Sequence, residues 1–166
     1  MDQLTAAVIA AAIAFGSALL GAVAGYLGAV QLHIKDVQAQ QRGAARAVYY
    51  EVRRNAAMLG GVLAEPMLPI PLDRSSFESC IAVLANFLTP GELEAVTLAY
   101  IQHENVLRVI AGMQDRRSVD LMPDEKGLLT IMLQQQLAAR DVLMLRGFDA
   151  AERQQLADHR AAQMGL

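Results

Sequence analysis

The chain has 166 residues, of which 54% are hydrophobic, with a net charge of −3 and a single cysteine. This length allows one domain with an appended segment, and the acidic balance argues against general nucleic-acid binding, which uses basic surfaces. The lone Cys80 excludes an intrachain disulfide and a multi-cysteine metal site. The lack of tryptophan and the abundance of alanine, leucine and methionine favour an all-α fold.

The N-terminal segment is typical of a membrane anchor. From Gln3 to Ile34 no side chain carries a fixed charge, and about 20 apolar residues suffice to cross a bilayer. A cleaved signal peptide is the alternative, but it would carry a basic N-terminal region and a shorter apolar stretch. The cations after the segment predict an outside N-terminus and a cytoplasmic C-terminal domain: Lys35, Arg42, Arg46, Arg53 and Arg54. Of these, Lys35 and Arg42 lie close enough to contact anionic lipid head groups.

Small residues repeat along one side of this predicted membrane helix: Ala14, Ser17, Gly21, Gly25 and Gly28. We call these five residues the glycine seam. Large residues, among them Leu20 and Leu27, recur on another side. Small residues let two membrane helices approach closely, so we expect the seam to pack against a partner, either a second copy or another membrane protein. The alternative to a packing surface is that glycine and alanine are simply common in membrane helices.

The rest of the chain divides at turn signals into further helices. We expect an anchor over residues 1–35, a juxtamembrane helix over 36–65, a proline-rich connection over 66–75, and the remaining helices of a bundle of four to five over 76–166.

Helix start and stop signals give the bundle its predicted boundaries. Ser75 or Ser76 caps a short helix that ends near Leu88. The stretch "TPGE" from Thr89 opens a helix running to about Arg116. Its apolar positions predict a set of buried residues: Leu93, Val96, Tyr100, Leu107 and Ile110.

Two further helices complete the predicted bundle. One begins near Pro123 and ends at Gly147, which the pattern assigns as the residue that terminates it. It is apolar on more than one face, so it is either central in the bundle or part of an interface. The capping pattern from Asp149 opens a last helix that ends near Gln163.

Polar residues that could carry chemistry fall on two of these helices. His103, Glu104 and Asn105 are adjacent, and Glu51 and Asn55 lie one turn apart on the juxtamembrane helix. No HExxH or ExxH spacing is present, so neither a zinc site nor a di-iron site is predicted. The five residues form a candidate polar cluster that shapes a pocket, or, as we prefer, a hydrogen-bond network that fixes helix register.

No motif for nucleophilic catalysis or phosphate binding is present, so we expect a protein that is not an enzyme and needs no cofactor. The layout, an anchor followed by "EVRRNAAML", a proline-rich break and "AYIQHENVL", resembles small bacterial single-pass membrane proteins, and we expect the inner membrane as its location. The first hypothesis is a scaffold or accessory subunit of a membrane complex. The second is a sensor whose bundle binds a small ligand, and the third is a phage-derived envelope protein with its domain outside the cytoplasm, which the cations after the anchor oppose.

Overall fold

The computed structural model describes residues 3–65 and 71–163, with side chains from 14 to 65 and from 71 to 159. Within these ranges the fold is all-α, as the composition predicted, and no strand is present. Six helices follow one another in the described chain: α1 (Gln3–Ala64), α2 (Ser75–Ala85), α3 (Pro90–Ile101), α4 (His103–Arg116), α5 (Pro123–Gly147) and α6 (Ala150–Gln163). Most of the predicted proline-rich connection, residues 66–70, lies outside the described residues.

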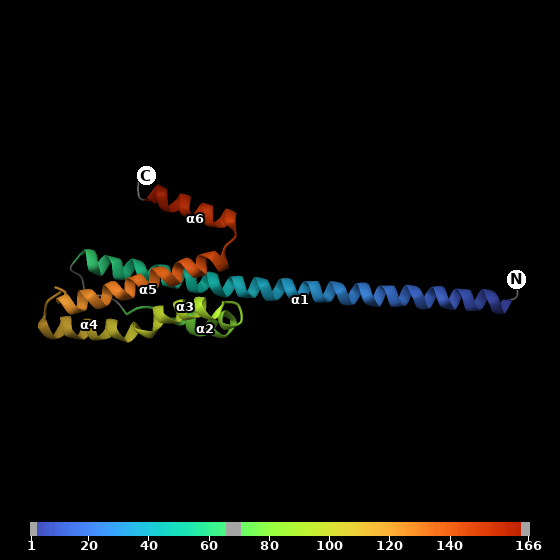
Figure 1. The fold of residues 1–166 in the computed structure, drawn as a ribbon, viewed down its shortest axis with the longest axis horizontal. Coiled ribbons are helices and arrows are strands. Elements are labelled where there is room, and N and C mark those ends of the chain that lie inside the picture. The colour runs from blue at the N-terminus through green and yellow to red at the C-terminus, as the bar shows by residue number, and fades with distance from the viewer. Residues whose placement is uncertain (1–2, 66–70, 164–166) are drawn as a thin grey trace. The chain divides into compact units, whose positions relative to one another are not determined.

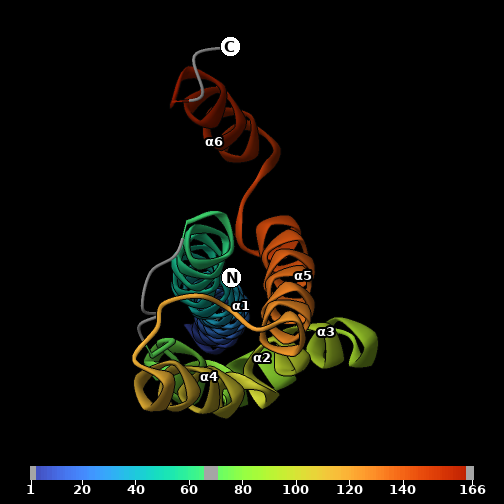
Figure 2. The same ribbon diagram turned by 90° about the vertical axis from the view of Figure 1, so that its left-hand side faces the viewer.

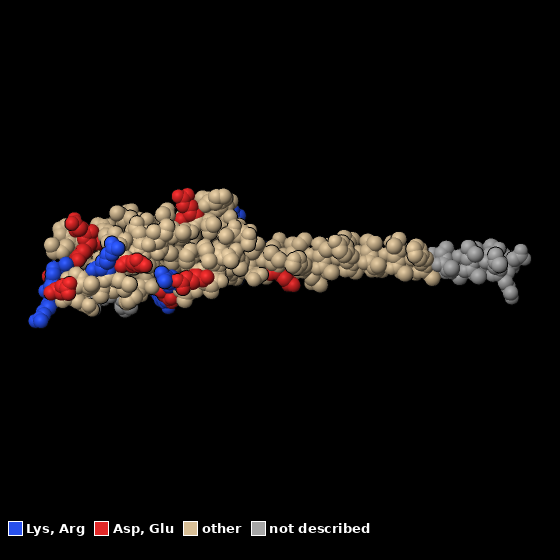
Figure 3. Space-filling view, turned by 90° about the horizontal axis from the view of Figure 1, so that it is seen from below, with Lys and Arg blue, Asp and Glu red and all other residues tan. Residues whose placement is uncertain are grey.

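The chain forms two compact units, Met1–Ala39 and Gln40–Leu166. In the first unit, the described part of α1 exposes its large apolar side chains, including Phe15, Leu20 and Tyr26, each at least 70% exposed. Among the described residues α1 is the one helix long and apolar enough to cross a membrane. On the face shown in Figure 3 the charged side chains gather over the second unit, and the described N-terminal part of α1 is almost free of them.

In the second unit α1 and α5 lie side by side, with α2, α3 and α4 across one side of the pair (Figures 1 and 2). The α3–α4 segment runs antiparallel to α5. Two ion pairs mark its ends: Arg146 with Glu92, at 2.8 Å, and Arg116 with Glu125, at 2.7 Å. The α5 helix thus buries one face in the bundle, while Ile131 and Leu145 on its other faces are 50% and 60% exposed, so an interface role for those faces stays a prediction.

Buried apolar side chains form two clusters in this unit. The first gathers residues of α1, α2, α3 and α5 around Val48, Tyr49 and Leu143, and the second gathers residues of α1, α4 and α5 around Leu59 and Met132. The buried positions of α5 recur every three or four residues, which places them on one face of a helix: Leu129, Met132, Gln136, Ala139, Leu143 and Gly147. Gln136 is the polar member of this row and lies between the two clusters.

The "TPGE" signal was correct about where a helix begins and wrong about how far it runs. Glu92 accepts a hydrogen bond from the Thr89 backbone N–H at 2.9 Å, which is half of a capping box. The expected continuous helix to Arg116 is interrupted at Gln102, which separates α3 from α4. This interruption shifts the face that α4 buries, so the expectation that Leu107 is buried is wrong: its side chain is 51% exposed, whereas Val106 is fully buried.

The end of α5 also differs from the prediction. Gly147 is the last helical residue, and its own φ lies outside the left-handed region, so it is not a left-handed terminator; Phe148 after it is extended, with a φ of −124°. A β-carbon at Gly147 would lie 3.3 Å from both the Ala45 β-carbon and the Arg46 backbone nitrogen. The close approach of α5 to α1, and not the backbone angles, therefore disfavours a larger residue at this position.

The start of α6 follows the predicted capping pattern. The Glu152 carboxylate accepts from the Asp149 backbone N–H at 2.8 Å, and the Asp149 carboxylate accepts from the Glu152 backbone N–H at 2.9 Å. Arg46 of α1 binds both ends of this junction, because it donates to the Gly147 carbonyl at 2.7 Å and to Glu152 at 2.6 Å. This arginine, predicted only as an orienting cation, therefore ties α1 to the α5–α6 turn.

Candidate functional site

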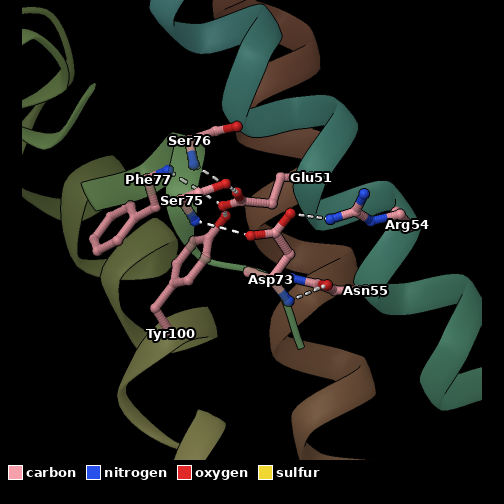
Figure 4. A network of polar contacts seen from close by, with 8 residues as sticks. All are labelled: Glu51, Arg54, Asn55, Asp73, Ser75, Ser76, Phe77 and Tyr100. Carbon is pink, nitrogen blue, oxygen red and sulfur yellow. Dashed lines mark hydrogen bonds and ion pairs between the residues drawn. The ribbon is translucent and has the colours of Figure 1, made fainter. Parts of the chain in front are cut away.

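The buried carboxylate of Glu51 is the centre of a polar network between α1, α2 and α3 (Figure 4). One of its oxygens accepts the backbone N–H of Ser76 at 2.6 Å, and the other accepts the backbone N–H of Phe77 at 3.2 Å and the Tyr100 hydroxyl at 2.7 Å. The Ser75 hydroxyl lies 3.4 Å from the first oxygen. Only 4% of Glu51 is exposed. A carboxylate is a suitable acceptor here because the first N–H groups of a helix have no intrahelical partner and carry a partial positive charge.

Glu51 therefore caps the start of α2, a role that the sequence predicted for Ser75 or Ser76. Neither Ser75 nor Ser76 caps α2: both lie inside the helix, whose flanking residue is Arg74, and no side-chain cap bond is made there. The helix also ends at Ala85, before the expected Leu88. Because the cap comes from a helix 24 residues or more away in sequence, local patterns could not have found it.

Asn55 lies one turn after Glu51 and fixes the backbone that leads into α2. Its side-chain amide donates to the Asp73 carbonyl at 2.7 Å and accepts from the Asp73 backbone N–H at 3.1 Å. The Asp73 carboxylate in turn accepts from the Ser75 backbone N–H at 3.0 Å and forms an ion pair with Arg54. These contacts, the Ser75 N–H first among them, lower the pKa of Asp73 to about 2.

A second buried polar contact joins α5 to the junction between α3 and α4. The Gln136 amide nitrogen donates to the Ala99 carbonyl at 2.6 Å and lies 3.2 Å from Nε2 of His103. Gln136 is fully buried and His103 is 6% exposed. The Ala99 carbonyl belongs to the last turn of α3, where carbonyls lack an intrahelical donor. Gln136 therefore caps the end of α3 as Glu51 caps the start of α2.

The structure divides the five residues of the candidate polar cluster. Glu51, Asn55 and His103 are buried at helix junctions, whereas Glu104 is exposed and Asn105 is half-buried. Two partners were missed by sequence reasoning: Asp73, which lies in the connection, and Gln136, whose polar side chain occupies a core position of α5. The spacing of Gln136 from Met132 and Ala139 on the buried face was the one signal that could have shown it.

None of the residues predicted to contact lipid or a membrane partner is a member of this network. In the first unit, Ala14, Ser17, Gly21, Gly25 and Gly28 are all exposed, and the Ser17 hydroxyl donates to the Ala14 carbonyl at 2.9 Å. A β-carbon added at any of these three glycines would meet open space. Lys35 and Arg42 are exposed as well. Packing and lipid contact at these positions stay predictions.

An open groove of about 560 Å³ lies between α1 and α6, lined by aromatic, aliphatic and polar side chains that include Tyr50, Phe148, Leu156 and Gln155. The Arg46 guanidinium lies 5.1 Å from the centre of the Phe148 ring on one wall. Over the described part of the chain, no group of three or more His, Cys, Asp or Glu side chains is arranged to hold a metal ion. The described part of the second unit thus offers two features that could serve a function: hydrogen bonds at helix ends and an amphipathic groove.

Comparison with known proteins gives no relative from which a function could be transferred. No protein-family model, no curated protein sequence and no solved structure matches the chain. The functional argument therefore depends on the residues and contacts described above.

Proposed function

We propose that this protein is a non-enzymatic, membrane-anchored helical scaffold or accessory subunit of a membrane complex. The observation that carries the proposal is the exposed apolar surface of α1 in the first unit, from Phe15 to Ile34. An apolar helix surface of this length is stable in the hydrocarbon of a bilayer and not in water. The inner membrane is the proposed location.

The buried polar groups support a structural role for the second unit. Glu51 caps α2, Asn55 holds the Asp73 backbone, and Gln136 caps α3. Each of these side chains thus fixes where a helix begins, ends or enters the bundle, as in networks that specify packing. This supports the network interpretation of the polar cluster over the pocket interpretation.

The glycine seam is the proposed contact with a partner in the membrane. Between membrane helices the hydrophobic effect is absent, so association depends on close packing of backbones across small residues. The open space around Gly21 and Gly25 within this chain leaves their surface available to another helix. A second copy and a different membrane protein are both compatible with this surface.

The mass of the intact protein, purified from its membrane in mild detergent, tests the seam. We expect an assembly larger than the monomer for the wild type, and at least a tenfold weaker assembly for Gly21→Ile and Gly25→Ile, since each branched side chain separates the two backbones. Leu27→Ile is the control, because it introduces the same side chain on another side of the helix and leaves the glycine seam unchanged. If the glycine variants lose a second copy of this chain, the seam serves self-association. If they lose a foreign subunit, the protein is an accessory protein of that subunit. A wild-type monomer without a companion contradicts the proposal.

The second unit is proposed to lie in the cytoplasm with the N-terminus outside, on the strength of the cations after the apolar segment. We expect a reporter enzyme that is active only in the cytoplasm to be active when fused to Leu166. A reporter active only outside the cytoplasm should be silent at the same position. The reverse result would favour an envelope protein with its domain outside.

A ligand-binding sensor is the second candidate, and the groove between α1 and α6 favours it. Its volume of about 560 Å³ and its aromatic lining suit a drug-sized molecule. A retained non-protein mass in the same detergent measurement, lost in Phe148→Ala, would support this function over the scaffold.

A further inference from the structure

The orientation of the Gln136 amide is set by the end of α3. Its nitrogen lies 2.6 Å from the Ala99 carbonyl oxygen, a distance at which only a donor is tolerated. The same nitrogen lies 3.2 Å from Nε2 of His103. Because an amide nitrogen donates and does not accept, His103 must present an unprotonated Nε2 to it. The neutral ring then carries its proton on Nδ1.

The contact does not accommodate a doubly protonated ring. A proton on Nε2 would place two donors face to face across 3.2 Å. Turning the Gln136 amide would supply an acceptor to His103, but it would also bring the amide oxygen against the Ala99 carbonyl oxygen. The Nδ1 atom of His103 and the amide oxygen of Gln136 are buried without a hydrogen-bond partner in the described structure. A charged ring could therefore donate from Nε2 only to the Ala99 carbonyl, which already accepts from Gln136, so the two donors would compete for one acceptor.

The surroundings of His103 oppose its charge on balance. Burial lowers the pKa of His103 below its ordinary value, and Arg74, at the start of α2, acts in the same direction. The carboxylates of Glu51 on α1 and Asp73 in the connection raise it, as does the Ala99 carbonyl of α3. The facing group on α5 is the uncharged Gln136, and the Tyr100 ring of α3 lies 4.8 Å away, centre to centre. The effect of burial on the pKa of His103 exceeds that of the two carboxylates, so the folded unit favours the neutral ring.

The contact between His103 and Gln136 lies at the break between α3 and α4. His103 is the first residue of α4, and it lies between the first apolar cluster, around Val48, and the second, around Leu59. We propose that His103 and Gln136 form a proton-operated joint: a proton on His103 breaks the contact with Gln136 and opens the α3–α4 junction from α5. At neutral pH the joint is closed and the bundle is rigid.

The sign of the pH dependence follows from proton binding. The open state, with its histidine in water, binds a proton near pH 6.5, whereas the closed state binds it only at lower pH. Stability of the closed joint is therefore fully present above pH 6.5 and falls as the pH falls below that value. At pH 5.5, one unit lower, the equilibrium constant for opening rises by at most about tenfold.

Two measurements on the full chain in detergent micelles test the joint. The first is a ¹⁵N NMR titration of the histidine side chains, in which we expect His103 as the Nδ1–H tautomer at pH 7.5. The second is hydrogen exchange at pH 7.5 and 5.5, corrected for the intrinsic rate. We expect the peptides around residues 99–106 and 132–139 to lose between twofold and tenfold in protection at the lower pH.

Histidine variants identify the residue responsible. His103→Gln should abolish this pH-dependent loss of protection, whereas His33→Gln and His159→Gln should keep it. An Nε2–H tautomer of His103 at pH 7.5 would overturn the proposal. So would equal corrected protection of the wild-type junction at the two pH values, and this readout does not depend on whether the His103 variant folds.

Discussion

Glu51→Ala is expected to lower the free energy of unfolding of the second unit by about 3 kcal/mol. The substitution removes the acceptor for two backbone N–H groups at the start of α2 and for the Tyr100 hydroxyl. A donor that is left buried without a partner costs the free energy of its lost hydration, and this cost is larger where the lost acceptor was charged. Urea unfolding of the full chain in mild detergent, followed by far-ultraviolet circular dichroism, measures the change.

Two variants make this result specific. Glu51→Gln keeps one acceptor oxygen but turns an amide donor toward the other contacts, so we expect roughly half the loss of Glu51→Ala. Glu104→Ala changes the same residue type at an exposed position and should stay within about 0.5 kcal/mol of the wild type. Equal stability of the Glu51 and Glu104 variants would show that the carboxylate does not hold α2 in place.

Gly147→Val is the second substitution with a large expected effect, a loss of about 2–3 kcal/mol in the free energy of unfolding. The first atom of any side chain at this position would lie 3.3 Å from the Arg46 backbone nitrogen. A β-carbon alone already needs its neighbours to give by a few tenths of an ångström, and the two methyl groups of valine need more, so we expect the end of α5 to separate from α1. The Arg46 contacts with the Gly147 carbonyl and with Glu152 would then weaken together. The same urea unfolding experiment measures this loss.

Gly127 of the same helix provides the matched control. A β-carbon at Gly127 meets no atom within 4 Å, so only the intrinsic helix preference changes. Gly127→Ala should therefore raise the free energy of unfolding by about 0.5–1 kcal/mol. If Gly147→Ala were equally stabilising, the close approach of α5 to α1 would not be the reason for glycine at position 147.

The sequence by itself determined the helical class, the long apolar segment and most helix starts. These features depend on interactions between residues that are close in the chain. Thr89 with Glu92, and Asp149 with Glu152, satisfy helix-end N–H groups within one turn, so their spacing is visible in the sequence. The same holds for the start of α5 at Pro123, where Glu125 accepts from the Met122 backbone N–H.

The tertiary structure decided the remaining features, because each depends on residues that are distant in the chain. The start of α2 is capped by Glu51 of α1, and the end of α3 is capped by Gln136 of α5, 37 residues away. In the sequence Gly147 has the pattern of a helix terminator, but in the structure its missing β-carbon allows a close approach to Ala45, 102 positions earlier. Local patterns show which backbone groups lack partners at a helix end, and only the packing of the helices shows which side chain supplies them.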